Sequence, residues 1–173
     1  MVLPSVIIIG GVCGSGKSTI GKELAERIGY AFLDADDLHT DEAKAKMGRA
    51  ESLSDAERMP WLARISEILN ANTDEKFVVA CSALKRKYRS ALLNGKRSER
   101  DKAIVMLVVP EEILRQRTAQ RRGHFANTNL IPSQLDDLEL PSQNEQEESR
   151  VVIVDGTQKV DEIVEESIRK TEN

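Results

Sequence analysis

The sequence has few aromatic side chains, only two cysteines and no excess of basic residues. Aromatic residues make up 3% of the 173 residues, which leaves few platforms on which the bases of a single strand could stack. The formal net charge is −4 and the pI is near 5.4, whereas nucleic-acid binders usually carry a basic excess. We therefore expect no nucleic-acid partner.

The cysteines and the apolar runs also exclude several classes of protein. Cys13 and Cys81 lack C-x-x-C spacing, so neither a zinc site nor a redox motif is indicated, and both are expected to be free thiols. No apolar run approaches the roughly 20 residues that cross a bilayer. The run that ends at Gly10 lacks the basic start of a signal peptide and is expected to be a buried strand. These absences predict a cytoplasmic protein without a membrane partner.

Short apolar runs alternate with helical patterns along the chain. The runs expected to form strands are Val6 to Ile9, Ala31 to Leu33, Phe77 to Ala80, Ala103 to Val109 and Val151 to Val154. Continuous apolar runs are typical of strands covered on both faces, as in parallel sheets. The alternation predicts an α/β fold with a mainly parallel five-stranded sheet, and the length suits a single domain over residues 1–173.

The helical segments have recognisable start and stop signals. Helices are expected near Ile20 to Ile28, Asp41 to Met47, Leu84 to Leu93 and Val160 to Ile168. Ser54 and Glu57 have capping-box spacing, and Pro60 is expected to break or kink the helical pattern that follows. Residues Gly123 to Pro132 are expected to be irregular, and Ser142 to Ser149 to form an exposed connection.

The segment GVCGSGKS at residues 11–18 matches the phosphate-binding motif G-x-x-x-x-G-K-[ST] at every fixed position. Glycines let the backbone turn its N–H groups toward phosphate oxygens, and the following helix adds its positive end. Lys17 is expected to reach the β- and γ-phosphates of ATP, and Ser18 to ligate Mg²⁺. A glycine-rich turn without a ligand is the alternative, which the flanking strand and helix disfavour. The residues expected to bind the nucleotide here are Gly11, Val12, Cys13, Gly14, Ser15, Gly16, Lys17, Ser18 and Thr19.

Acidic residues follow the second expected strand. Asp34 and Asp36 lie two positions apart, and in a parallel sheet this strand end faces the same crevice as the phosphate-binding loop. One carboxylate could hold Mg²⁺ while the other accepts a proton from an attacking hydroxyl, although the order of the two roles stays open. A solvated acidic turn is the alternative. His39 is a candidate substrate contact or a structural loop residue.

Several longer segments resemble the gluconokinases, small P-loop kinases related in fold to shikimate and adenylate kinases. Asp34 to His39 is similar to the family's D-A-D-D-x-H element, and Ala80 to Arg89 to A-C-S-A-L-K-R-x-Y-R. Leu53 to Leu62 resembles L-x-D-x-D-R-x-P-W-L, and the region from Gly123 to Glu139 resembles G-H-F…S-Q…L-E. The resemblance implies a three-layer α/β/α fold with a helical lid over about residues 121–138.

The resemblance also implies an activity and a set of roles. The reaction would be transfer of the ATP γ-phosphate to the 6-hydroxyl of D-gluconate. By resemblance Arg121 would close onto the phosphates and Arg117 would lie against adenine. With the loop and the acidic cluster, the catalytic candidates are Lys17, Asp36 and Arg121, and the metal candidates are Ser18 and Asp34. The residues expected to contact the acceptor are Asp36, His39, Arg58, Ser82, Lys85, Arg86, Arg89 and His124. For the three cations from Lys85 to Arg89, a solvated basic helix face is the alternative. Trp61 is expected in the core or in a pocket wall.

Some positions depart from the family pattern. Ala50 and Ser52 replace a glycine and a proline, Thr40 replaces a proline after His39, and Glu57 replaces an aspartate. These changes affect the expected loop shape more than the chemistry. The alternatives that remain are a related kinase for shikimate or another aldonate, and a nucleotide-binding module without catalysis. The family resemblance also allows a homodimer.

Overall fold

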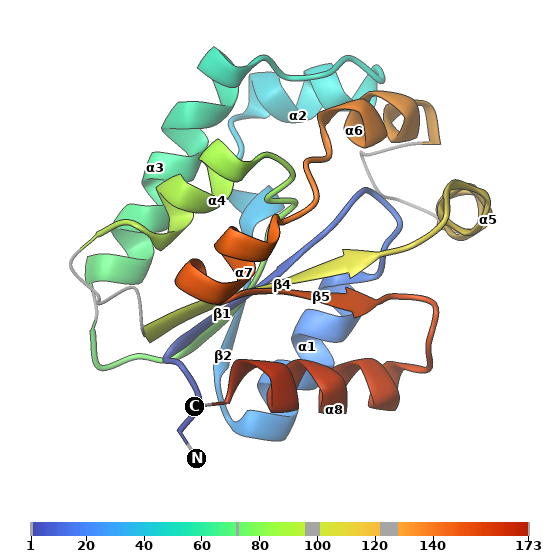
Figure 1. Ribbon diagram of the computed structural model, residues 1–173. Helices are drawn as coiled ribbons and strands as arrows, with labels where there is room; N and C mark the ends of the chain where they lie inside the picture. The colour runs from blue at the N-terminus through green and yellow to red at the C-terminus, as the bar shows by residue number, and fades with distance from the viewer. Residues whose placement is uncertain (1, 72, 96–100, 122–127, 173) are drawn as a thin grey trace.

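The computed structural model describes residues 2–71, 73–95, 101–121 and 128–172 (Figure 1). Its centre is a parallel sheet in the order β2-β3-β1-β4-β5. The strands are β1 (Val6–Gly10), β2 (Ala31–Asp34), β3 (Phe77–Ala80), β4 (Lys102–Val108) and β5 (Val151–Asp155). The prediction of a mainly parallel five-stranded sheet is confirmed, and every pairing among the described strands is parallel.

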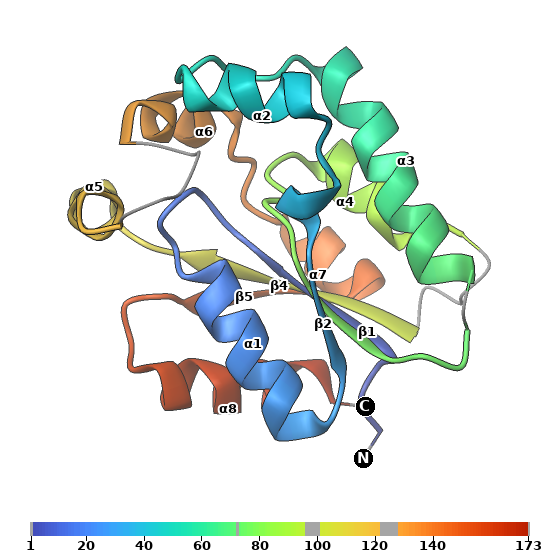
Figure 2. The same cartoon turned by 180° about the vertical axis from the view of Figure 1, so that it is seen from behind.

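Helices cover both faces of the sheet, which gives the three expected layers (Figures 1 and 2). One face packs against α1 and α8, and the other against α3, α4 and α7. The helices are α1 (Lys17–Ile28), α2 (Asp41–Gly48), α3 (Asp55–Ala71), α4 (Arg86–Leu93), α5 (Glu111–Ala119), α6 (Ile131–Asp137), α7 (Gln143–Ser149) and α8 (Val160–Thr171), with short 3-10 turns η1 (Ala35–Leu38) and η3 (Thr128–Leu130). No helix among the described residues is long and apolar enough to cross a membrane.

Strand β1 is buried along its whole length because it lies in the middle of the sheet. Ile7 and Ile9 point into the cluster beneath α1 and α8, whereas Val6 and Ile8 point into the cluster beneath α3 and α4. This two-sided burial explains why the strand is continuously apolar rather than alternating. It also fixes the loop after β1 at the centre of the carboxyl edge of the sheet.

Two local predictions are wrong. Helix α3 runs unbroken through Pro60, so the expected break is absent; Trp61, Leu62 and Ile65 pack into the core and keep the helix continuous past the proline. The Ser54–Glu57 capping box starts the helix as expected: Ser54 N donates to Glu57 Oε2 over 2.7 Å, and Glu57 N donates to Ser54 Oγ over 3.3 Å. The segment expected to be an exposed connection instead contains α7, whose Glu145 is buried.

Pro60 removes one backbone hydrogen bond from the interior of α3, since its nitrogen has no proton to donate to the carbonyl of Ala56. We expect Pro60→Ala to raise the free energy of unfolding by about 1–2 kcal/mol, after allowance for the added freedom of the unfolded chain. Urea unfolding followed by circular dichroism measures the change. Ala63→Pro, at an exposed position one turn further on, should instead destabilise the protein by about 3 kcal/mol. A less stable Pro60→Ala variant contradicts the expectation.

Candidate active site

The phosphate-binding loop joins β1 to α1 and is fixed by contacts on both sides. Gly11 N donates to Ser82 O over 3.0 Å, which ties the loop to the segment after β3. Gly14 has φ 86°, and a Cβ there would lie 2.5 Å from Thr118 Oγ1 and 2.9 Å from Leu114 O of α5. Only glycine fits this left-handed backbone and this close approach. The loop therefore keeps its shape through backbone contacts, as a cradle for phosphate requires.

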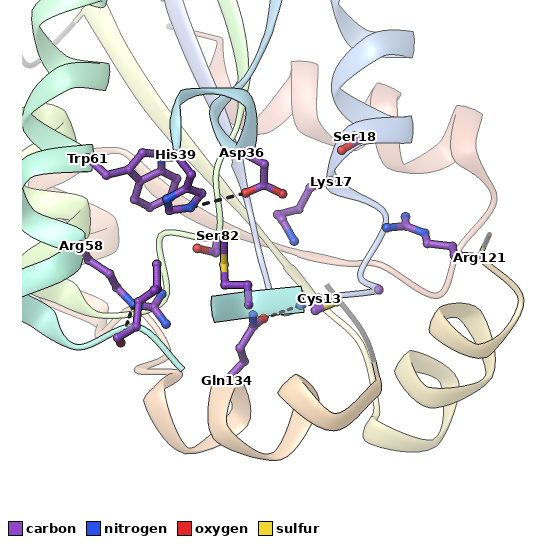
Figure 3. A pocket seen from close by; sticks show the side chains of 13 residues that line it. Cys13, Lys17, Ser18, Asp36, His39, Arg58, Trp61, Ser82, Arg121 and Gln134 are labelled. Atoms are coloured by element: carbon purple, nitrogen blue, oxygen red, sulfur yellow. Dashed lines mark hydrogen bonds and ion pairs between the residues drawn. The ribbon is translucent and has the colours of Figure 1, made fainter. Parts of the chain in front are cut away.

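Lys17 and Ser18 begin α1 at the open side of this loop. Lys17 Nζ donates to Val12 O over 3.2 Å, so the ammonium group lies across the loop. Ser18 Oγ donates to Asp34 Oδ2 over 3.1 Å. The other oxygen of Asp34 accepts from Asp36 N over 3.0 Å and caps the turn η1. Asp34 therefore faces Ser18, whereas Asp36 lines the pocket beside Lys17 (Figure 3).

The oxygens of Ser18 and Asp34 are the hard donors that Mg²⁺ prefers. Among the described residues, no three histidine, cysteine, aspartate or glutamate side chains gather into a metal cluster. This arrangement fits Mg²⁺, which is usually bound by one or two protein ligands together with substrate phosphates and water. It does not fit a zinc site, which takes three or four protein ligands.

A cavity of about 370 Å³ lies on the α5 side of the phosphate-binding loop. Its walls come from the loop, from α5, and from the β5–α8 connection with the first turns of α8. Arg117 donates to Ser15 O over 3.3 Å and to Gly156 O over 2.9 Å, so its guanidinium spans two of these walls. Arg121 lines this cavity and also the neighbouring pocket. The position beside the loop suits the nucleoside part of ATP.

The neighbouring pocket is bounded by residues from the phosphate-binding loop, the η1 region, α3, the segment after β3 and α6. Figure 3 shows His39, Trp61 and Arg58 on one side and Arg121 on the other, with Asp36 and Lys17 between them. The lining residues are Cys13, Gly14, Lys17, Ser18, Asp36, His39, Met47, Leu53, Arg58, Trp61, Ser82, Arg121 and Gln134. The pocket thus brings a lysine, two arginines and an aspartate to the edge of the phosphate cradle.

His39 and Trp61 form the wall behind Asp36. Their rings stack with centroids 4.0 Å apart and an interplanar angle of 14°, and Trp61 Nε1 donates to Ala35 O over 2.7 Å. His39 Nε2 lies 4.0 Å from Asp36 Oδ1. Burial lowers the pKa of His39 to about 4, and the charges of Arg58 and Lys44 act in the same direction. His39 is therefore neutral near pH 7.

Arg58 and Lys85 share a carboxylate on α6. Asp137 Oδ2 lies 3.6 Å from Arg58 Nη2, and Asp137 Oδ1 lies 3.3 Å from Lys85 Nζ. Lys85 also lies 3.3 Å from Asp55 Oδ1. The Asp55 carboxylate accepts hydrogen bonds from Lys87 and Tyr88, and these bonds, led by that of Lys87, hold its pKa well below the usual range. The acceptor-side cations are thus partly neutralised by carboxylates of the protein.

The structure separates the expected acceptor contacts into two groups. Asp36, His39, Arg58 and Ser82 line the pocket, whereas Lys85 and Arg86 do not. The prediction that Arg89 contacts the acceptor is wrong, because its side chain is fully buried and bonded to Glu145. His124 lies outside the described residues, as do all of residues 122–127 of the expected lid. The described remainder of the expected lid contains η3 and α6.

Several residues at this site have no role predicted from the sequence. Gln134 Oε1 accepts from Cys13 N over 2.7 Å, which joins α6 to the phosphate-binding loop. Met47 and Leu53 also line the pocket, and Asp137 lies behind it. Gln134 lies in a segment that resembles the family, but the resemblance gave no contact. The other three also lie in or beside segments that resemble the family, and the resemblance gave them no contact either.

Three residues that depart from the family pattern have distinct local structure. Ala50 has φ 60°, a left-handed conformation that costs a non-glycine residue roughly 1–2 kcal/mol. Ser52 Oγ donates to Ser133 Oγ over 2.8 Å, which links the turn to α6. Thr40 caps α2 by accepting from Ala43 N over 3.1 Å. Ala50 therefore adopts a backbone conformation that glycine would favour, at some cost in strain.

Comparison with known proteins places this fold and site in a class. The family model described as shikimate kinase matches residues 13–172. With the phosphate cradle and the adjoining pocket, this match defines a P-loop kinase that uses ATP to phosphorylate an alcohol. A probable gluconokinase of Dictyostelium discoideum is 41% identical over 93% of this chain and 83% of its own length. A probable gluconokinase of Xenopus tropicalis is 39% identical over 93% of this chain and 90% of its own length.

Solved structures agree with these sequence matches. A crystal structure of a gluconokinase from Sinorhizobium meliloti 1021 superposes with a TM-score of 0.85 at 41% identity, over 99% of this chain and 93% of that one. The chain belongs to the gluconokinase family.

The buried imidazole gives a pH prediction. Below about pH 6.5 the unfolded chain protonates His39, whereas the folded protein does so only near pH 4, so His39 lowers stability as the pH falls through this range. His39→Phe keeps an aromatic ring for the stack but cannot be protonated. We expect the melting temperature of the wild type, relative to His39→Phe, to fall between pH 7 and pH 5. A constant difference across these pH values contradicts the assignment.

Proposed function

We propose that this protein is a gluconokinase that transfers the γ-phosphate of ATP to the 6-hydroxyl of D-gluconate, giving 6-phospho-D-gluconate and ADP. The observation that carries the proposal is one pocket that holds Lys17, Asp36 and Arg58 at the mouth of the phosphate cradle. A sugar acid needs a cation for its carboxylate and polar groups for its hydroxyls. The names of the relatives support the choice of gluconate.

The arrangement suggests an orientation for the acceptor. Arg58 lies at the end of the pocket farther from Lys17, so the gluconate carboxylate would lie toward Arg58 and the 6-hydroxyl toward Asp36 (Figure 3). Asp36 would accept the hydroxyl proton as the oxygen attacks the γ-phosphorus. The new O–P bond forms as the bond between the γ-phosphorus and the β,γ-bridging oxygen breaks, and ADP leaves with that oxygen.

Lys17 and Arg121 would stabilise the charge that develops during transfer. Lys17 would exchange its bond to Val12 O for phosphate oxygens, which costs little because that bond is a single contact at 3.2 Å. Arg121 lines both the nucleotide cavity and the acceptor pocket, so its guanidinium is placed to meet the transferring group. Arg117 would contact the nucleoside beside Gly156.

Mg²⁺ fits beside Ser18 and Asp34, where it would neutralise phosphate charge and orient the γ-phosphate. The two side chains are already joined by a hydrogen bond, so the serine oxygen and the carboxylate are close to positions from which both could contact one ion or its waters. This assignment gives Asp34 the metal side and leaves Asp36 for the proton.

The function is tested by ADP release with ATP, Mg²⁺ and a panel of acceptors: gluconate, other sugar acids, shikimate and nucleosides. We expect gluconate to give the highest kcat/KM, and a higher value for shikimate or a nucleoside contradicts the proposal. The absence of acceptor-dependent ADP release would favour a nucleotide-binding module. As a check on mechanism, Asp36→Asn should lower kcat by about 10²- to 10⁴-fold with little change in the KM for ATP. Asp37→Asn, at the exposed neighbouring position, should leave both unchanged.

The position of Asp137 predicts that its carboxylate weakens the binding of an anion in the pocket. Its carboxylate contacts Arg58 and Lys85, so it lowers the positive potential that a gluconate carboxylate would meet. We expect Asp137→Asn to lower the KM for gluconate by about three- to tenfold, which corresponds to about 0.7–1.4 kcal/mol of binding. Steady-state kinetics at low salt measures the change, and Asp136→Asn at the exposed neighbouring position is the control. A higher KM in Asp137→Asn would show that the carboxylate instead supports the pocket.

A further inference from the structure

Arg89 and Glu145 form a buried ion pair behind the acceptor pocket. Arg89 Nε donates to Glu145 Oε1 over 2.6 Å and Nη2 donates to Oε2 over 2.9 Å, so the pairing is bidentate. The side chains are 0% and 5% exposed. The two residues are 56 positions apart, on α4 and α7. Neither lines the acceptor pocket or the nucleotide cavity.

The remaining amino group of Arg89 holds the backbone that follows β3. Arg89 Nη1 donates to Ala83 O over 3.0 Å and to Leu84 O over 2.9 Å. Ala83 has φ 48°, a left-handed conformation that is unfavourable for alanine and persists only when the surroundings impose it. Arg89 supplies that constraint from one side, with Glu145 fixing the orientation of the guanidinium.

Ser82 precedes this strained residue and joins the two halves of the site. Its side chain lines the acceptor pocket, and its carbonyl accepts from Gly11 N at the start of the phosphate-binding loop over 3.0 Å. A change in the backbone at Ala83 and Leu84 would therefore move a group in the acceptor pocket and a contact of the phosphate-binding loop together.

The segment between α6 and α7 fastens the same backbone from the other side. Glu139 N donates to Leu84 O over 2.9 Å, and Arg86 N donates to Glu139 Oε2 over 2.8 Å. Leu84 O therefore accepts from both Arg89 and Glu139. A lysine could not replace Arg89, because only the planar guanidinium reaches a carboxylate and two carbonyls at once.

We infer that Arg89, oriented by Glu145, is a positioning residue that sets the backbone of residues 82–84 and so places Ser82 in the acceptor pocket. The inference rests on the proposed function for its kinetic consequences. The stability of a buried ion pair does not explain its presence here, since well-packed apolar residues often stabilise a core as much. The two hydrogen bonds from Arg89 to the strained loop, with two more that hold its guanidinium on Glu145, are explained by the need to fix that loop.

Kinetics of a double-mutant cycle test the inference. We expect Glu145→Gln to lower kcat/KM for gluconate at least about tenfold in fully folded protein, and the loss to be much smaller when Ser82 is already alanine. Arg89→Lys should lose activity in the same way, and it replaces Glu145→Gln in the cycle if that variant does not fold. Ile168→Ala, near the carboxyl end of α8 and lining neither cavity, controls for destabilisation and should keep normal kinetics. Additive losses for Glu145→Gln and Ser82→Ala, or a loss in the control equal to that in Glu145→Gln, would overturn the inference.

Amide hydrogen exchange gives a readout that does not depend on the acceptor. Glu145→Gln should speed exchange at Gly11 N and Arg86 N at least about tenfold more than at amides in β1, whereas Ile168→Ala should leave this ratio unchanged. Unchanged relative exchange at both amides would overturn the inference. If another acceptor proves best in the panel, the proposed function fails while the exchange result still decides the role of Arg89.

Discussion

The parallel pairing of β1 with β3 is the constraint on which the site depends. It places Ile9 beside Ala80, so both strands end at the same level of the sheet. The hydrogen bond from Gly11 N to Ser82 O continues this pairing into the two loops. Because β2 pairs with β3 on the other side, Asp34 reaches the same edge. The phosphate-binding loop, the two aspartates and Ser82 of the acceptor pocket therefore lie together because the three strands that precede them end at the same edge of the sheet.

The cations at this edge contact backbone carbonyls or share one carboxylate, and within the part of the chain that the structure describes none of the three named next has a carboxylate to itself. Lys17 contacts a carbonyl, Arg58 shares Asp137 with Lys85, and Arg117 contacts two carbonyls. His39 adds no charge near Asp36, because burial keeps it neutral. Cations held by carbonyls or by a shared carboxylate remain able to bind phosphate or an acidic acceptor, which a tight one-to-one ion pair would prevent.

The sequence was sufficient to predict the sheet, the phosphate-binding loop and the two aspartates. These features depend on local patterns: continuous apolar strands, glycine spacing, and residues that directly follow a strand. The burial of Arg89 could not be predicted, because its partner Glu145 lies in a polar segment with no apolar face to mark it as a helix. The break expected at Pro60 is absent for the opposite reason. There the local signal is strong, but the packing of Trp61, Leu62 and Ile65 against the sheet overrides it.

The central claim is that one pocket at the carboxyl edge binds gluconate with its 6-hydroxyl beside Asp36 and its carboxylate toward Arg58. A crystal structure with a non-hydrolysable ATP analogue, Mg²⁺ and gluconate tests it most directly. We expect the 6-hydroxyl within hydrogen-bond distance of Asp36, with the metal beside Ser18 and Asp34. Gluconate bound with its carboxylate at Asp36, or outside this pocket, would contradict it.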